Sequence, residues 1–207
     1  MIRRQWIIAI SINLLTILLV LSPFLPGPSF LSKPTNIIFS LAQLGSLLGV
    51  LLVPIGLTWT FSRIKQGKNI KILSVLLWTV PVVSFIFSIG GSVLARDISR
   101  KIAINNASSL ITAIEDYKDM HEEYPANISE LKPTFIKEIP KPGVMGIGRY
   151  GYKKKNESYN LMFSQNVTIG LNSEIVVYDP EQNHKAEGEL ETLYDTGEKN
   201  WKYYIYD

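Results

Sequence analysis

The chain has 207 residues, enough for one ordinary domain of about 100 to 150 residues plus a membrane anchor, but not for two large soluble domains. Its 21 basic and 18 acidic residues are segregated: eight basic and no acidic residues precede Asp97, and thirteen basic and eighteen acidic residues make up the rest. Because positive charge beside apolar segments sets membrane orientation, this pattern argues against nucleic-acid binding. The lack of cysteine excludes disulfides, thiolate nucleophiles and Cys-ligated metals.

Three apolar segments are long enough to cross a bilayer, which takes about 20 residues of helix. They cover residues 6–25, 37–61 and 70–94. Only helices satisfy their backbone groups in lipid at these lengths, so we predict a three-helix transmembrane anchor over residues 1–95. Pro54 and Pro81 interrupt the second and third segments, where we expect packing kinks. The first segment is too long for a signal-peptide core and lacks a small-residue cleavage site, so we expect it to stay attached.

Basic residues in the short connections predict the orientation of the anchor. Arg3 and Arg4 precede the first segment, four basic residues lie between the second and third, and residues 22–36 contain only Lys33. Positive charge concentrates on the cytoplasmic side of a membrane. We therefore predict a cytoplasmic N-terminus and an extracytoplasmic domain formed by residues 96–207.

Hydrophobic periodicity in residues 96–207 predicts an α+β domain. Apolar residues recur at helical spacing from Ile98 to Tyr124, with Arg100 on the opposite, polar face, and the helix must end before Pro125. A short helix or turn is expected at residues 128–135 and a loop at 139–148. Strands are predicted at residues 150–153, 159–164, 174–178, 189–194 and 201–206. The predicted fold is a long amphipathic helix packed on a small antiparallel sheet.

A series of residues in this domain resembles type IV pilins, and especially the major pseudopilin of type II secretion systems. The matching residues are Tyr117, Tyr124, Pro125, Leu131, Pro140, Pro142, Tyr150 and Tyr152. The resemblance covers about residues 90–164. It implies a bacterial inner-membrane protein whose long helix packs on a small sheet, with the Tyr-Pro pair marking the exit from the helix.

Two departures from the pilin pattern limit what the resemblance implies. Pilins have a glutamate five residues after the leader glycine, but Ile72 stands five residues after Gly67. The loop from Pro140 to Gly148 also lacks the acidic residues with which the family can hold calcium. We therefore expect neither leader processing nor extraction into a filament, and we predict no metal site from the resemblance.

Three groups of residues have the composition of ligand sites without the required spacing. A calcium loop that begins at Asp179 would need glycine and glutamate where His184 and Leu190 stand. Acidic residues at one helix end do not surround an ion, and the glycines do not have the order of a phosphate-binding loop. The groups are Asp179, Glu181 and Asn183; Asp119, His121, Glu122 and Glu123; and Gly143, Gly146 and Gly148. We predict no cofactor, metal or catalytic residue.

Two surface features suggest contacts with partners. Strand alternation should send some of the C-terminal aromatic residues into the core and others to a surface that could bind a peptide or glycan. The candidate interaction surface comprises Trp201, Tyr203, Tyr204 and Tyr206, with Tyr194 nearby. Lys153, Lys154 and Lys155 are expected at an exposed hairpin tip, or alternatively against anionic headgroups or a partner.

The sequence leaves two functional hypotheses. The first is a non-enzymatic structural or protein-interaction component of the bacterial envelope, whose partners are the lipid bilayer and an envelope protein or a second copy of the chain. The alternative is an extracytoplasmic sensor module that binds a ligand or calcium, which requires a pocket or ion site between the sheet and its loops. An enzyme would need titratable groups clustered in a cleft.

Overall fold

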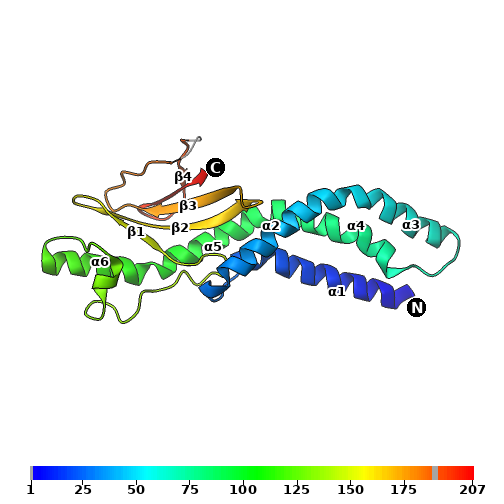
Figure 1. Cartoon of the computed structure of the whole chain (residues 1–207), viewed down its shortest axis with the longest axis horizontal. Helices are drawn as coiled ribbons and strands as arrows, with labels where there is room; N and C mark the ends of the chain where they lie inside the picture. Colours follow the sequence, from blue (N-terminus) through cyan, green and yellow to red (C-terminus); the bar gives the residue numbers. More distant parts are fainter. Residues whose placement is uncertain (1, 188–190) are drawn as a thin grey trace.

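The computed structural model describes residues 2–187 and 191–207, with side chains described from Arg4 onward. The molecule is elongated, with a helical half that contains the N-terminus and a sheet-bearing half that contains the C-terminus (Figure 1). Within the described residues, three helices are long and apolar enough to cross a membrane: Arg4–Phe24, Ser29–Lys65 and Ile72–His121. This confirms the three predicted helices. The second begins earlier than predicted, and the third continues past residue 94 into the sheet-bearing half.

Each long helix is built from shorter segments. The first joins α1 (Ile2–Leu21) to the 3₁₀ turn η1 (Ser22–Phe24). The second comprises η2 (Ser29–Leu31), α2 (Ser32–Gly49), η3 (Val50–Leu52) and α3 (Val53–Lys65). The third comprises α4 (Ile72–Phe85), the π-helical η4 (Ile86–Gly91), α5 (Ser92–Asn106) and α6 (Ser108–His121). Pro54 lies in the first turn of α3, directly after the tightened η3 segment.

Small residues allow α2 and α3 to pack closely on α4. A Cβ atom at Gly49 would lie 2.9 Å from the ring of Pro81, and one at Gly56 would lie 3.0 Å from Leu77 and from the backbone of Trp78. Such close approach of backbones at small residues is typical of helices that associate in lipid. These positions therefore set the spacing within the helical half.

The sheet has five strands in the order β1-β2-β3-β5-β4, and all neighbouring pairs are antiparallel. The strands are β1 (Gly151–Lys154), β2 (Tyr159–Thr168), β3 (Asn172–Tyr178), β4 (Tyr194–Asp195) and β5 (Trp201–Tyr206). The strand predicted at residues 201–206 is confirmed, and those at 150–153, 159–164 and 174–178 are confirmed with shifted ends. Of the strand predicted at 189–194, residues 189 and 190 lie outside the described residues, and only Tyr194 is in a strand.

The core of the sheet-bearing half lies between the sheet and the helices α5 and α6, which run along one of its faces (Figure 1). The buried side chains of Ala103, Ala107, Leu110 and Ile114 line the helical side, as the periodicity predicted. Full burial of a side chain such as Leu110 stabilises the fold by about 1.5–3 kcal/mol. The predicted single helix to Tyr124 is corrected in two ways: it is interrupted at Ala107, and it ends at His121, before a left-handed Glu122.

The connection between the first two long helices packs against the sheet-bearing half. Pro26 and Val144 form an antiparallel bridge, and the backbone N–H of Gly27 donates to the carbonyl of Gly143 over 2.9 Å. The N–H of Gly146 donates to the carbonyl of Pro23 over 2.7 Å. This contact between residues 22–28 and the loop at 142–147 was not predicted from the sequence.

Candidate functional site

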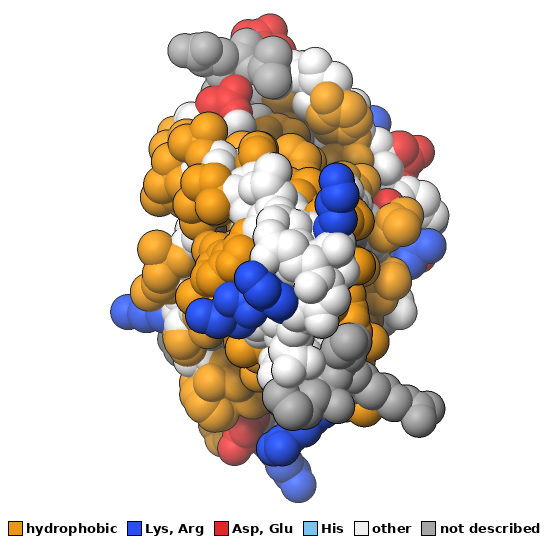
Figure 2. All heavy atoms as spheres, turned by 90° about the vertical axis from the view of Figure 1, so that its right-hand side faces the viewer, with side chains coloured by type: hydrophobic (Ala, Val, Ile, Leu, Met, Phe, Trp, Pro, Cys, Tyr) orange, Lys and Arg blue, Asp and Glu red, His pale blue; other side chains and the backbone are white. Residues whose placement is uncertain are grey.

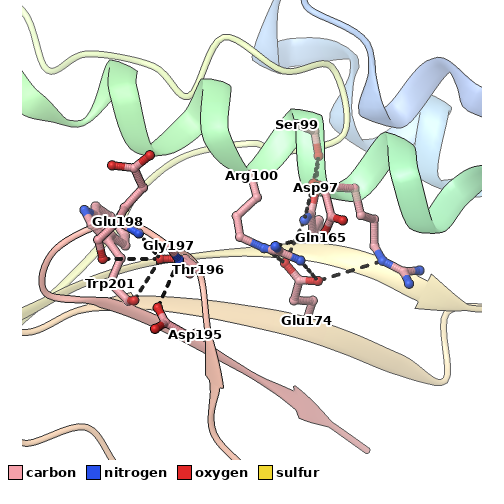
Figure 3. Close-up of polar contacts among 11 residues, drawn as sticks. Asp97, Ser99, Arg100, Gln165, Glu174, Asp195, Thr196, Gly197, Glu198 and Trp201 are labelled. Atoms are coloured by element: carbon pink, nitrogen blue, oxygen red, sulfur yellow. Dashed lines mark hydrogen bonds and ion pairs between the residues drawn. The ribbon is translucent and has the colours of Figure 1, made fainter.

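A buried ionic cluster joins α5 to the middle of the sheet (Figure 3). Arg100 donates two hydrogen bonds to the carboxylate of Glu174 on β3, from Nε to Oε1 over 2.7 Å and from Nη2 to Oε2 over 2.8 Å. Gln165 on β2 donates to Glu174 Oε1 over 2.8 Å and accepts a hydrogen bond from the hydroxyl of Ser99. All four side chains are buried. The prediction that Arg100 lies on the polar face of the helix was therefore wrong.

The charges of this cluster balance. Two arginines, Arg96 and Arg100, face two carboxylates, Glu174 and Asp97. Asp97 Oδ1 lies 3.0 Å from Arg100 Nη1, while Arg96 Nε lies 3.8 Å from Glu174 Oε2. Buried charges are tolerated when they are paired and hydrogen-bonded, and such a pair requires one relative position of the two elements. The cluster therefore fixes the register of α5 on the sheet.

Aromatic side chains continue the cluster towards the β4 edge of the sheet. The guanidinium carbon of Arg100 lies 3.9 Å from the ring centroid of Tyr203, a cation–π arrangement. Tyr203 stacks on Tyr194 of β4, with ring centroids 5.1 Å apart. A compact turn between β4 and β5 holds this edge, because the Thr196 hydroxyl donates to the carbonyl of Trp201 over 2.8 Å (Figure 3).

The candidate interaction surface predicted at the C-terminus has to be corrected. Trp201 and Tyr203 point to the helix side of the sheet, and Tyr204 and Tyr206 point to the other side. Trp201 is buried in the core on the helix side, and Tyr204 is buried on the outer face. Tyr203 is half-buried over Arg100. Only Tyr206 among the four is well exposed, at 48%, while Tyr194 is 41% exposed.

A single buried amide, Gln43 of α2, connects the helical half to the sheet-bearing half. Its Nε2 donates to the π-helical carbonyl of Ser88 over 3.0 Å and to the carbonyl of Val167 over 3.3 Å. Its Oε1 accepts from the backbone N–H of Ile169 over 2.5 Å. Polar groups surrounded by apolar helices need such partners. Gln43 therefore holds the turn after β2 against α2.

The residues that match the pilin pattern lie along α5 and α6 and in the loops that connect α6 to the sheet. Tyr150 donates from its hydroxyl to the carbonyl of Ala103 over 2.5 Å, and Tyr152 donates to the carbonyl of Pro125 over 2.7 Å. Burial raises the pKa of both phenols. The other six residues, which pack around the helix end or the loop that follows it, are Tyr117, Tyr124, Pro125, Leu131, Pro140 and Pro142.

The carboxylate of Glu115 on α6 accepts hydrogen bonds from two aromatic hydroxyls, of which Tyr124 belongs to this series. Tyr124 and Tyr159 donate to the two oxygens of Glu115, over 3.2 Å and 2.9 Å. Burial, followed by the nearby Glu115 charge, raises the pKa of Tyr124 to about 12. Both phenols are therefore hydrogen-bond donors at neutral pH, and they fasten the loop after α6 and strand β2 to α6.

The groups considered as ligand sites have structural partners instead. Asp179 is fully buried and accepts hydrogen bonds from Lys155 Nζ over 2.7 Å, Asn160 Nδ2 over 2.9 Å and the N–H of Glu181 over 3.0 Å. Burial opposes ionisation of this group, but these donors outweigh it and lower the pKa of Asp179. Within the described residues, no three His, Cys, Asp or Glu side chains are placed to hold a metal ion together.

The structure gives separate partners to the residues of the acidic helix end, the three lysines and the glycines. His121 packs against Tyr117 at a tilt, with ring centroids 4.3 Å apart, and Glu123 forms an ion pair with Lys154 over 3.0 Å. Lys155 is engaged by Asp179, so the three lysines at the hairpin do not act as one basic group. Backbone hydrogen bonds hold Gly143 and Gly146 against the first connection, and Gly148 lies against Ser32 at the start of α2.

A cleft of about 780 Å³ lies over the outer face of the sheet. Its floor includes Asn160, Met162 and Val177 of the central strands, and the segment from Glu181 to Lys185 covers it. Pockets for small molecules commonly measure about 300–1,000 Å³. The cleft is thus of a size that can hold a small ligand, and it was not located from the sequence.

Comparison of the chain with protein-family models, with curated proteins and with solved structures gives no match. The resemblance to pilins therefore stays a prediction.

Proposed function

We propose that this chain is a multi-pass protein of the bacterial cytoplasmic membrane that holds a pilin-like, non-enzymatic α+β domain outside the cytoplasm as a structural or protein-interaction component. The N-terminus lies in the cytoplasm, and residues from about 96 onward lie outside. The expected partner is another envelope protein or a second copy of the chain.

The surface of the helical half supports insertion into a membrane. Large apolar side chains point outward along α1 to α3, with Leu48 63% exposed and Leu51 74% exposed. Apolar surface this continuous is stable only when another apolar phase covers it. Figure 2 shows the end with the α3–α4 connection, where basic side chains lie across the tip and hydrophobic side chains cover the flanks. Arg63, Lys65, Lys68 and Lys71 belong to this tip, which matches the expected cytoplasmic side.

The observation that carries the proposal is the threefold attachment of the sheet-bearing half to the helical half. The helix Ile72–His121 passes through both, Gln43 hydrogen-bonds the turn after β2, and residues 22–28 pair with the loop at 142–147. A domain attached in this way keeps a defined orientation to the bilayer. Such a fixed orientation suits a component of an assembly, whereas a filament subunit has to leave the membrane.

The β4 edge offers the most suitable surface for a protein partner. Tyr194 is exposed and stacks on Tyr203, which the arginine of the buried cluster holds on the helix side of the sheet, while Tyr206 is exposed on the opposite face of β5. Tyrosine is enriched at protein interfaces because it has a large, rigid apolar surface and one polar group. A stacked pair that is already fixed loses little conformational freedom on binding.

Photo-crosslinking in native membranes tests this surface. A photoreactive phenylalanine analogue replaces Tyr194, Tyr206 or, as a control, Met120, which is 66% exposed at the far end of α6. We expect one discrete adduct from positions 194 and 206 and none from 120. The mass of the adduct distinguishes self-association from a different envelope protein. Equal labelling at all three positions, or none at 194 and 206, would contradict the proposal.

Topology is tested separately with reporter fusions. A cytoplasmic reporter should be active when inserted after Gly67, and an extracytoplasmic reporter should be active when fused after Asp207. The chain should stay in the membrane fraction after carbonate washing. Activity of the cytoplasmic reporter at the C-terminus would overturn the orientation.

The cleft on the outer face favours a second candidate function, a ligand-binding sensor. Its lining combines Lys153, Lys185 and His184 with the carboxylates Glu181 and Glu187 and the apolar Met162. Thermal unfolding of the full chain in detergent, with and without millimolar calcium chloride, tests the calcium form of this hypothesis. A rise in midpoint that is lost in E181Q/E187Q would support the sensor, and an unchanged midpoint would exclude calcium as its ligand.

A further inference from the structure

A groove lies where the two halves of the molecule meet. It has a volume of about 230 Å³ and is bounded by α2, the π-helical η4, the first turn of α5 and the turn after β2. Leu47, Ile89 and Val93 form its apolar walls, and all three are exposed on the flank of the helices. Arg96 contributes the charge of the lining, in which the described residues include no carboxylate. The groove therefore combines an apolar wall with a single positive charge.

Most polar groups in the groove are already satisfied by the chain. Gln43 is engaged by Ser88, Val167 and Ile169, and the hydroxyl of Ser92 donates to the carbonyl of Ile89 over 3.0 Å. Arg96 is different. Its closest carboxylate, Glu174, lies 3.8 Å away and already accepts two short hydrogen bonds from Arg100.

The guanidinium of Arg96 has donors to spare. Its side chain is 12% exposed, and it donates no hydrogen bond to any part of the chain that the structure describes. A guanidinium has five N–H donors in a planar fork that matches a phosphate. An anion at the open end of the groove would complete the hydrogen bonding of this side chain.

The dimensions of the groove fit an amphiphile and not a soluble ligand. Arg96 lies seven residues beyond Ile89 along the third long helix, a rise of about 10 Å. The volume is below the range of about 300–1,000 Å³ typical of small-molecule pockets. Part of an acyl chain fits such a space if the rest of the chain remains among the lipids that cover the exposed walls.

We propose that this groove binds one anionic phospholipid, with its phosphate on Arg96 and one acyl chain along Leu47, Ile89 and Val93. The proposal rests on the membrane insertion argued above, because the groove opens on the flank that lipid would cover. The π-helical turn contributes by widening the helix next to Ser88, whose carbonyl is satisfied by Gln43. A bound lipid would reinforce the contact between the two halves.

Lipid retention by the full chain tests the proposal. The protein is reconstituted in nanodiscs with equimolar phosphatidylglycerol and phosphatidylcholine, and the lipids that remain after detergent washing are counted by native mass spectrometry. We expect about fivefold preference for phosphatidylglycerol, the effect of one basic side chain near a phosphate. R96Q should lose the preference and R96K should keep it. V93W, which fills the apolar wall, should retain neither lipid.

K101Q is the matched control, because Lys101 is exposed on the same helix and lies outside the groove. Equal loss of preference in K101Q and R96Q would reduce the effect to general charge and overturn the proposal. The proposal would also be overturned if R96Q retained phosphatidylglycerol as the wild type does, or if a photo-crosslinker at Val93 gave a protein adduct. If carbonate washing releases the chain, the proposed function itself fails. If the chain stays in the membrane without lipid preference, only the lipid site fails.

Discussion

Neutralising Glu174 should strongly destabilise the sheet-bearing half. In E174Q the buried Arg100 loses a carboxylate that now accepts from it over 2.7 Å and 2.8 Å. Removing one partner of a buried ion pair costs about 3–5 kcal/mol, because the other charge stays buried without compensation. Asp97 remains 3.0 Å from Arg100, but half of its side chain is exposed, so solvent screens it. We therefore expect E174Q to lower the free energy of unfolding by about 3 kcal/mol, the lower end of that range.

Two variants make this prediction specific. E123Q removes the carboxylate from an exposed ion pair with Lys154 and should leave stability unchanged within error, because solvent screens exposed pairs. The double variant R100M/E174M replaces both charges with apolar side chains of similar length. It should recover most of the loss, because replacing a buried pair by apolar residues is commonly neutral or stabilising.

Pulse proteolysis of the full chain in detergent, across a urea series, measures these differences. The midpoint for cleavage within residues 150–207 reports on the sheet. The reasoning is refuted if E174Q is no less stable than E123Q, since Glu174 would then not be compensating a buried charge. It is also refuted if R100M/E174M is less stable than E174Q.

Three further predictions follow from individual contacts. The lowered pKa of Asp179 stabilises the fold above the ordinary pKa of an aspartate, and this contribution is lost as the pH falls through the folded-state value. Unfolding midpoints should therefore drop below about pH 4 in the wild type and less steeply in D179N. G146A should cost about 1–3 kcal/mol, because its Cβ would lie 2.4 Å from the carbonyl oxygen of Pro23, whereas G45A, with free space around it, should not destabilise the chain in the same proteolysis assay. Q43L should speed hydrogen exchange at the N–H of Ile169, which loses its acceptor, without changing exchange in β5.

Local patterns predicted most of the individual elements, although not the extent of β4 or the break at Ala107. The run of β-forming aromatic residues from Trp201 to Tyr206, which follows turn residues, predicted β5, and helical spacing from Ala103 to Ile114 predicted the buried face of α5 and α6. The predicted end of the third long helix, Tyr124, lies beyond the observed end, His121. Pro125 sets only the last residue at which the helix can end, and the helix can end before it. The helix in fact stops where Glu122 adopts a left-handed conformation, which no residue type signals reliably.

Contacts between distant segments could not be predicted in the same way. The pairing of residues 22–28 with the loop at 142–147 uses backbone groups, so no side-chain pattern marks it. The Arg100–Glu174 pair did leave a signal. Arg100 precedes Ala103 and Ala107 at helical spacing, and Glu174 alternates with Val176 on the buried face of β3, so both charges fall on core faces. Two opposite charges at predicted core positions would have indicated a pair.

The length of the second long helix determines how the outer domain is held. Its 37 residues extend about 55 Å, whereas the hydrocarbon of a bilayer is about 30 Å thick. If one end lies at the basic α3–α4 connection, nearly the first half of the helix must emerge on the other side. That half contains Asn36, whose amide donates to the carbonyl of Gly146 over 2.8 Å.

In the proposed orientation, the emerging part of this helix would act as a second support beside α5. A domain joined to a membrane by one helix can swing about that helix, but one supported along two helices and by the first connection cannot. The exposed Tyr194 and Tyr206 would then keep a fixed direction relative to the bilayer. A partner that recognises this edge has to match its height above the membrane as well as its chemistry, which favours another membrane-anchored protein over a freely diffusing one.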